Sequence, residues 1–177
     1  MIQKTLIATS AAVMLMAGAA IADSNGKQGT PDRFVGTYTL QGQTDTVSGP
    51  FGSLPCTVFQ QFSPDFICAN TSLLELRADG TTGTTIAGQA PVSEVFGNWR
   101  QTGQRQIAIE SIAIVYDPNG VAANWALTSS TISFDRSLSS VTSSFEINWF
   151  PITDDPRNPT SPPVITFVGG SEGAKFD

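Results

Sequence analysis

The chain has 177 residues, of which 40% are hydrophobic and only 14% are charged, and its formal net charge is −6. An acidic chain without a basic cluster repels nucleic acid and anionic lipid headgroups, so neither is expected as a partner. The chain contains no histidine. This excludes Ser-His-Asp and Cys-His catalysis, imidazole zinc sites and histidine general bases.

The first 22 residues have the pattern of a cleaved secretory signal peptide. Lys4 is the only charged residue before an apolar run over residues 6–21, which ends in the small-x-small sequence Ala20-Ile21-Ala22. The run is shorter than the roughly 20 residues that a spanning helix needs, and no later stretch is long and apolar enough. We therefore expect a periplasmic or secreted protein with no membrane span.

Nine segments at most have the composition of β-strands. Residues 23–32 contain no large apolar side chain and are expected to be a disordered lead-in. Residues 41–55 are polar and contain glycine, so a loop is expected there. The predicted strands are residues 33–40, 56–62, 71–78, 81–87, 92–102, 105–116, 121–134, 139–152 and 164–168.

Two cysteines, Cys56 and Cys68, lie on either side of the segment that follows the second of these strands. In an exported protein such a pair is expected to form a disulfide. A redox-active pair is the alternative, but it typically has a closer spacing such as Cys-x-x-Cys.

Turn sequences separate the later strands. Asp79-Gly80 and Asp117-Pro118-Asn119-Gly120 both carry residues that hairpin turns favour, and each interrupts β-prone, apolar runs. Residues 153–163 hold four prolines and two adjacent aspartates, which predicts an exposed loop before the last short strand and a glycine-rich tail. We expect antiparallel hairpins at both Asp-initiated turns.

Regularly spaced strands without helical periodicity predict one all-β domain over residues 33–177. A closed antiparallel barrel of about eight strands is favoured over a sandwich, because the strand at 105–116 is apolar on both faces. Such a strand fits a barrel wall with an outer cover. It also fits a subunit interface, which leaves a homo-oligomer open.

Four short motifs occur in order along this domain. They are Gly-Thr-Tyr at 36–38, Ala-Asp-Gly-Thr at 78–81, Gly-Asn-Trp-Arg-Gln-Thr-Gly at 97–103 and Tyr-Asp-Pro-Asn-Gly at 116–120. Over residues 34–150 the chain resembles uncharacterised bacterial β-barrel proteins of the calycin-like or allene-oxide-cyclase-like type. It departs from true lipocalins, which carry tryptophan where Tyr38 stands, and the segment from Cys56 to Cys68 resembles an insertion.

The resemblance implies a barrel that binds a small apolar molecule, and a few such barrels are cyclases. Glu110 is the candidate catalytic residue, because it lies in the most apolar strand and a buried carboxylate has a raised pKa. The alternative is that Glu110 lies on a wet face or pairs with Arg100. Glu146 is a second candidate for an interior carboxylate. Further candidates for lining a ligand site are the aromatic residues Tyr38, Trp99, Tyr116, Trp125, Trp149 and Phe150, for most of which core filling is the alternative explanation.

Three functions follow from these expectations. The first is an exported barrel that binds a small hydrophobic molecule without altering it. The second is a cyclase or isomerase that acts on a lipid-like or polyketide-like substrate through Glu110, and the third is a structural or interaction protein with a filled barrel. No cofactor and no metal is expected, since no Asp-x-Asp-x-Asp-Gly loop is present for calcium.

Overall fold

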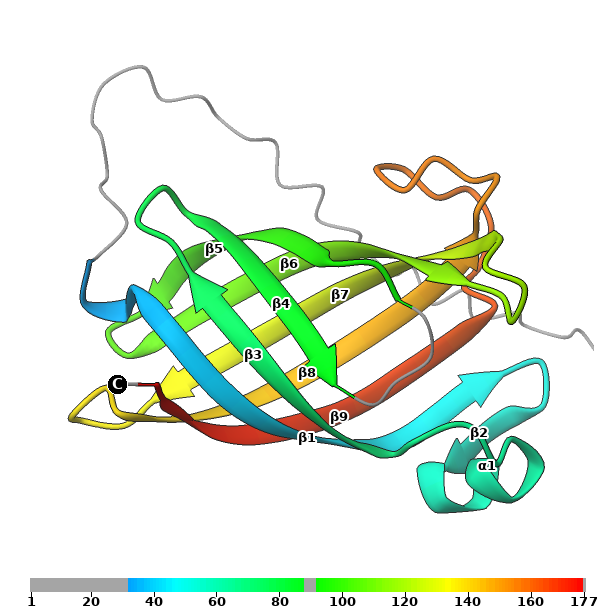
Figure 1. The fold of residues 1–177 in the computed structure, drawn as a ribbon, viewed down its shortest axis with the longest axis horizontal. Coiled ribbons are helices and arrows are strands. Elements are labelled where there is room, and N and C mark those ends of the chain that lie inside the picture. Colours follow the sequence, from blue (N-terminus) through cyan, green and yellow to red (C-terminus); the bar gives the residue numbers. More distant parts are fainter. Residues whose placement is uncertain (1–31, 88–91, 177) are drawn as a thin grey trace, which may run out of the picture.

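Eight long antiparallel strands form a closed barrel in the computed structural model, which describes residues 32–87 and 92–176 (Figure 1). Each strand pairs with the next along the chain, and the last strand pairs with the first to close the barrel. The predicted antiparallel barrel of about eight strands is therefore confirmed. The expected signal peptide (1–22) and all but the last residue of the expected lead-in (23–32) lie outside the described residues.

The barrel strands are β1 and β3 to β9, while β2 is an additional strand that pairs only with the end of β1. A short helix α1 follows β2 at one end of the barrel (Figure 1). The elements in order are η1 (Asp32–Phe34), β1 (Gly36–Gly49), β2 (Gly52–Pro55), α1 (Cys56–Phe62), β3 (Ala69–Leu76), β4 (Thr81–Ala87), β5 (Val95–Gly103), β6 (Gln106–Tyr116), β7 (Ala122–Phe134), β8 (Ser140–Pro151) and β9 (Ile165–Lys175).

Alternation along each strand separates an inner from an outer face. On β6 the side chains of Ile107, Ile109, Ala113 and Val115 are buried and point inward, whereas Glu110 is exposed on the outside. The outer face of β6 is itself partly apolar and half-buried. The strand thus has the two apolar faces that the sequence predicted. The odd-numbered side chains of β6 are the ones that point into the barrel.

Both predicted Asp-initiated hairpins are confirmed: the first joins β3 to β4 and the second joins β6 to β7. The Asp79 carboxylate accepts hydrogen bonds from the hydroxyl and the backbone N–H of Thr81. The Asp117 carboxylate accepts from the backbone N–H of Val121 at 2.9 Å and from that of Asn119. These hydrogen bonds hold the pKa of both carboxyl groups below the usual value, because they stabilise the charged form.

One end of the barrel is closed by a buried plug. Helix η1 places Phe34, which is fully buried, over this end, where its ring packs 4.7 Å from that of Phe134. The buried Tyr38 hydroxyl donates a hydrogen bond to the carbonyl of Phe34 at 2.9 Å, and the Trp99 indole N–H donates to the carbonyl of Arg77. The polar tips of both aromatic side chains are therefore satisfied, and this end is solid core.

The predicted strand at 56–62 is wrong, because these residues form helix α1. Their sequence is β-prone, but the segment lies with β2 beyond the end of the barrel and pairs with none of the described strands (Figure 1). A helix satisfies backbone N–H and C=O groups within one segment, whereas a strand needs a neighbour. Position in the fold therefore overrides the local β-propensity.

Two predicted irregular regions are also wrong, since both belong to strands. Residues expected to be a loop extend β1 as far as Gly49, and the expected glycine-rich tail is the second half of β9. These two stretches pair with each other and close the barrel. At this seam Gly169 approaches β1 so closely that an added Cβ would lie 2.0 Å from the carbonyl oxygen of Gln43. Glycine in β9 therefore permits the closure that a larger residue would block.

We expect acid to weaken the two Asp-initiated hairpins. A carboxyl group whose folded-state pKa lies below its ordinary value of 3.8 stabilises the fold above that pH, and this contribution is lost as pH falls through the folded-state pKa. The double variant Asp79→Asn/Asp117→Asn keeps the acceptor oxygens but does not titrate. Urea unfolding at pH 6 and pH 2.5 should show a smaller loss of stability in this variant than in the wild type. An equal loss of stability in the variant and the wild type would show that these two carboxylates do not contribute to the acid sensitivity.

We expect Gly169→Ala to lower the free energy of unfolding by about 1–3 kcal/mol, because its methyl group must displace the β1 backbone at the seam. Gly83→Ala is the matched control, since Gly83 lies in β4 and an added Cβ there meets nothing nearer than 3.4 Å. Denaturant unfolding of both variants measures the difference. A Gly169→Ala protein as stable as the Gly83→Ala control would show that the seam tolerates a side chain.

Candidate functional site: a cavity inside the barrel

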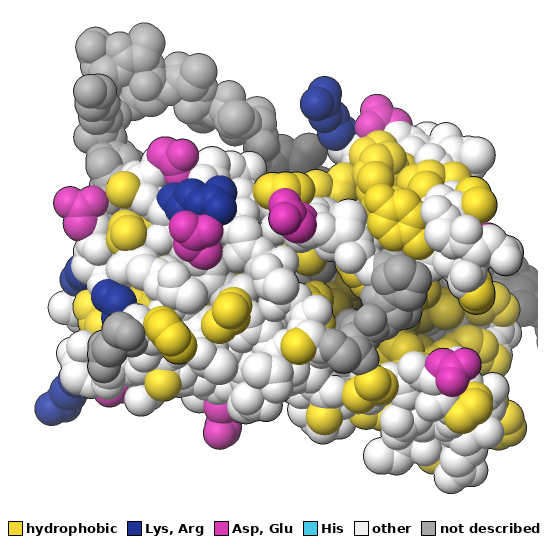
Figure 2. All heavy atoms as spheres, viewed as in Figure 1, with side chains coloured by type: hydrophobic (Ala, Val, Ile, Leu, Met, Phe, Trp, Pro, Cys, Tyr) yellow, Lys and Arg dark blue, Asp and Glu magenta, His cyan; other side chains and the backbone are white. Residues whose placement is uncertain are grey.

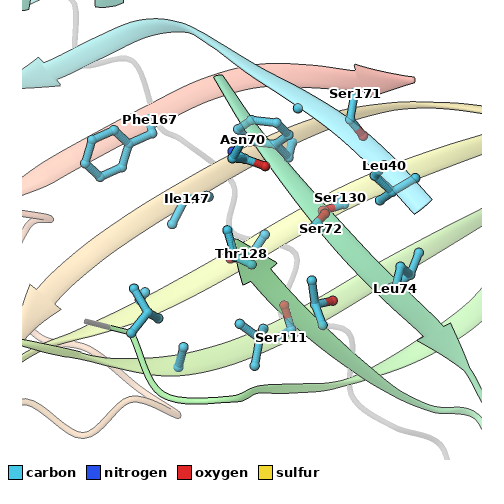
Figure 3. Close-up of a pocket in the computed structure, with 18 of the residues that line it drawn as sticks. Leu40, Asn70, Ser72, Leu74, Ser111, Thr128, Ser130, Ile147, Phe167 and Ser171 are labelled. Atoms are coloured by element: carbon cyan, nitrogen blue, oxygen red, sulfur yellow. The ribbon is translucent and has the colours of Figure 1, made fainter. Parts of the chain in front are cut away.

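A cavity of about 140 Å³ lies inside the barrel, beyond the plugged end. Figure 3 shows side chains from both sides of the barrel wall converging on this space. The described lining residues are Leu40, Gly42, Thr44, Phe66, Asn70, Ser72, Leu74, Thr84, Ile86, Val92, Val95, Ile109, Ser111, Ala113, Val115, Ala126, Thr128, Ser130, Ile132, Ser143, Phe145, Ile147, Trp149, Phe167 and Ser171. None of them is charged, so the wall is apolar with hydroxyl and amide groups set into it.

The end of the cavity opposite the plug is bordered by residues 56–68, which we call the insertion. The predicted disulfide is present: Cys56, at the start of α1, is bonded to Cys68, just before β3. Both cysteines are buried, although the segment between them is mostly exposed. The disulfide therefore fixes the insertion to the barrel at the point where β3 begins.

A series of aromatic contacts joins the insertion to the cavity wall. The ring of Phe59 packs on that of Phe66, which is stacked on Phe167 of β9 with centroids 5.2 Å apart. Phe167 in turn packs against Trp149 of β8. Because Phe66, Phe167 and Trp149 all line the cavity, the insertion forms part of the cavity wall. Figure 2 shows a hollow lined with hydrophobic side chains above the insertion.

The interior holds no carboxylate among the residues described. Glu110 was the candidate interior carboxylate, with a wet face as the alternative, and the structure places it on the outer face of β6, exposed, between Asn98 of β5 and Ser129 of β7. The interior position is therefore wrong, and the wet face is correct. The cause is the two-residue period of a strand: its neighbours Ile109 and Ser111 point inward, so Glu110 must point outward. Its suggested partner Arg100 forms no ion pair either, since Glu75–Arg77 is the one pair within 4 Å in the described residues.

Of the other seven predicted site residues, Trp149 alone lines the cavity. Tyr38 and Trp99 belong to the plug, where burial raises the pKa of the Tyr38 hydroxyl above its usual value near 10. Glu146 is exposed and accepts a hydrogen bond from the Asn148 amide. The remaining three do not line the cavity; they are Tyr116, Trp125 and Phe150.

Sequence reasoning favoured aromatic and acidic side chains and missed the small polar ones. The clearest example is β7, where Thr128 and Ser130 stand between Ala126 and Ile132 on one face and all four line the cavity. Hydroxyl groups on the buried face of a strand break the apolar alternation. The sequence contains this break in the alternation, but its meaning becomes clear only when the inward face of β7 is known.

Comparisons of the chain with protein-family models, curated proteins and solved structures found no match. No group of three or more acidic, cysteine or histidine side chains that would suit a metal ion occurs in residues 32–87 and 92–176. Over the same residues, no helix has the length and apolar character needed to cross a membrane. The resemblance to calycin-like and allene-oxide-cyclase-like barrels stays a prediction.

We expect loss of the disulfide to loosen the insertion more than the barrel. In the variant Cys56→Ser/Cys68→Ser the segment would regain chain entropy worth about 3 kcal/mol, equivalent to roughly a hundredfold increase in local opening. Hydrogen exchange should then accelerate in residues 56–68 while β6 to β8 keep their protection. Equal acceleration throughout the barrel would show that the disulfide stabilises the whole domain instead.

Proposed function

We propose that this protein is an exported barrel that binds a small hydrophobic molecule in its interior without altering it. The supporting observation is the cavity inside the barrel, which is lined mainly by aliphatic and aromatic side chains. Ligand sites in proteins typically combine such apolar walls with a few polar groups. Export is supported by the disulfide, which forms and persists in oxidising compartments.

Binding is favoured over catalysis by the chemistry of the lining. A cyclase or isomerase of the expected kind needs an acid or base that touches the substrate. The described lining offers hydroxyl and amide groups but no carboxylate, amine or thiol, and Glu110 lies on the opposite face of β6. A barrel filled with side chains, which is the structural alternative, would leave no cavity of this size.

The test is a fluorescence titration with N-phenyl-1-naphthylamine, an uncharged probe whose emission rises in apolar surroundings. Ala113 points into the cavity from β6, whereas Ala108 on the same strand points outward. We expect Ala113→Leu to weaken probe binding at least roughly tenfold, because the added side chain occupies the space that the probe needs. Ala108→Leu makes the same change on the outer face and should leave the affinity unchanged.

Urea unfolding of both variants verifies that each is folded at the titration temperature. If Ala113→Leu does not fold, Ala126→Leu changes a second cavity-lining alanine, on β7, and serves the same purpose. Absence of probe binding by the wild type, or equal binding by the inward and outward variants, would refute interior binding.

A further inference from the structure

Several polar side chains in the cavity wall have no hydrogen-bond partner among the residues that the structure describes. Ser72 and Thr44 are only 8% and 3% exposed, and Ser111, Thr128 and Ser130 are partly buried. No side-chain hydrogen bond to any of these five hydroxyl groups occurs among the described residues, although Ser143 and Ser171, also in the wall, bond to each other. Figure 3 shows Ser72, Ser111 and Ser130 directed into the same space.

These hydroxyl groups must be open to the cavity. Every fully enclosed side-chain nitrogen or oxygen in the described residues has a hydrogen-bond partner. Hydroxyl oxygens without a protein partner are therefore not sealed in the wall but face the cavity space. Leaving a polar group unpaired in apolar surroundings costs free energy. A molecule that forms hydrogen bonds to these hydroxyl groups should therefore bind in the cavity more tightly than one that does not.

Two of the polar groups form a matched pair on one wall. Ser111 of β6 and Thr128 of β7 are direct cross-strand partners, and both point inward. On the other side of Ser111 stands Gly97 of β5, where an added Cβ would lie 2.6 Å from the Ser111 Cβ. A side chain at Gly97 would therefore collide with Ser111, and glycine at this position avoids the collision. A hydroxyl pair is thus built into the wall made by β5, β6 and β7.

A second polar position lies on β3, beside β1. Asn70 lines the cavity opposite Gly42, and a Cβ at Gly42 would lie 2.7 Å from the Asn70 side-chain oxygen. An asparagine amide both donates and accepts hydrogen bonds, and so does a hydroxyl group. Ser72 follows two residues later on the same face. The wall therefore offers neutral donors and acceptors on two sides, and none of its described residues is charged.

We propose that the cavity selects an uncharged molecule with an apolar body and a hydroxyl or carbonyl group, which hydrogen-bonds to Ser111 and Thr128. This inference rests on the proposed function and specifies its ligand class. An ionised carboxylate or ammonium group would lose its hydration in the cavity and find no counter-ion there. A neutral alcohol or ketone would lose less hydration and would pair with the hydroxyl groups.

The test compares three ligands with the same ten-carbon chain at pH 8: 1-decanol, decanoate and decyltrimethylammonium. Each is titrated as a competitor of bound N-phenyl-1-naphthylamine, below its aggregation concentration. We expect 1-decanol to displace the probe at a concentration at least roughly tenfold lower than either charged ligand, because only it enters without burying a charge. Equal or tighter competition by a charged ligand would overturn the inference.

A variant pair tests the role of the hydroxyl groups. Ser111→Ala/Thr128→Val removes both from the wall and nearly keeps its shape, and we expect roughly five- to fiftyfold weaker competition by 1-decanol. The control Ser129→Ala/Thr131→Val makes the same changes on the outward face of β7 and should have no effect. Unchanged 1-decanol affinity in the inward variant would overturn the assignment of these two residues.

The outcomes separate this inference from the proposed function. If the wild type fails to bind the uncharged probe, interior binding itself is refuted. If the probe binds but the ligands do not differ by charge, interior binding stands and the selection for neutral molecules is refuted. A preference for 1-decanol that weakens in the inward variant, and not in the control, supports both.

Discussion

Closure of the barrel between β1 and β9 is the constraint on which the rest of the structure depends. An open sheet of this size would leave two edge strands with unpaired backbone groups, and closure removes them. The seam joins the first strand to the last, so it forms between the residues farthest apart in the domain. It requires close backbone approach at Gly169 and a register shift between Thr44 and Thr46, which keeps both Thr44 and Val47 on the inner face.

The two ends of the closed barrel differ in how they are filled, and the cavity lies beyond the end that is packed with large side chains. At one end η1 carries Phe34 into a core of large, buried side chains, which closes that end. At the other end the wall is completed by the insertion, whose Phe66 reaches Phe167 from outside the barrel. Between them the inward face also carries small and hydroxyl-bearing side chains, among them Ala113, Ala126 and Ser130, and these leave part of the barrel's width unfilled. The polar groups therefore lie where a ligand would reach them.

Apolar side chains on the outer face of the barrel explain why the sequences of the middle strands are apolar on both faces. Ile112 of β6 stands between Phe96 of β5 and Leu127 of β7, and together these side chains form an apolar strip across the outer wall. Trp125 and Phe150 continue this surface, and the Trp125 indole N–H donates to the carbonyl of Ile152 in the chain that leaves β8. The proline-rich segment thus begins against the outer wall, and Phe150 is buried although it points away from the interior.

The sequence by itself determined the fold class, the two Asp-initiated hairpins and the disulfide, because alternation, turn chemistry and cysteine pairing act between residues close along the chain. Tertiary structure alone decided the ends of β1 and β9, the helical state of residues 56–62 and the inner face of each strand. These depend on which segments become neighbours in space. Glu110 and Ser111 are adjacent in the chain and equally compatible with a cavity, and only closure of the barrel turned the hydroxyl inward and the carboxylate into water.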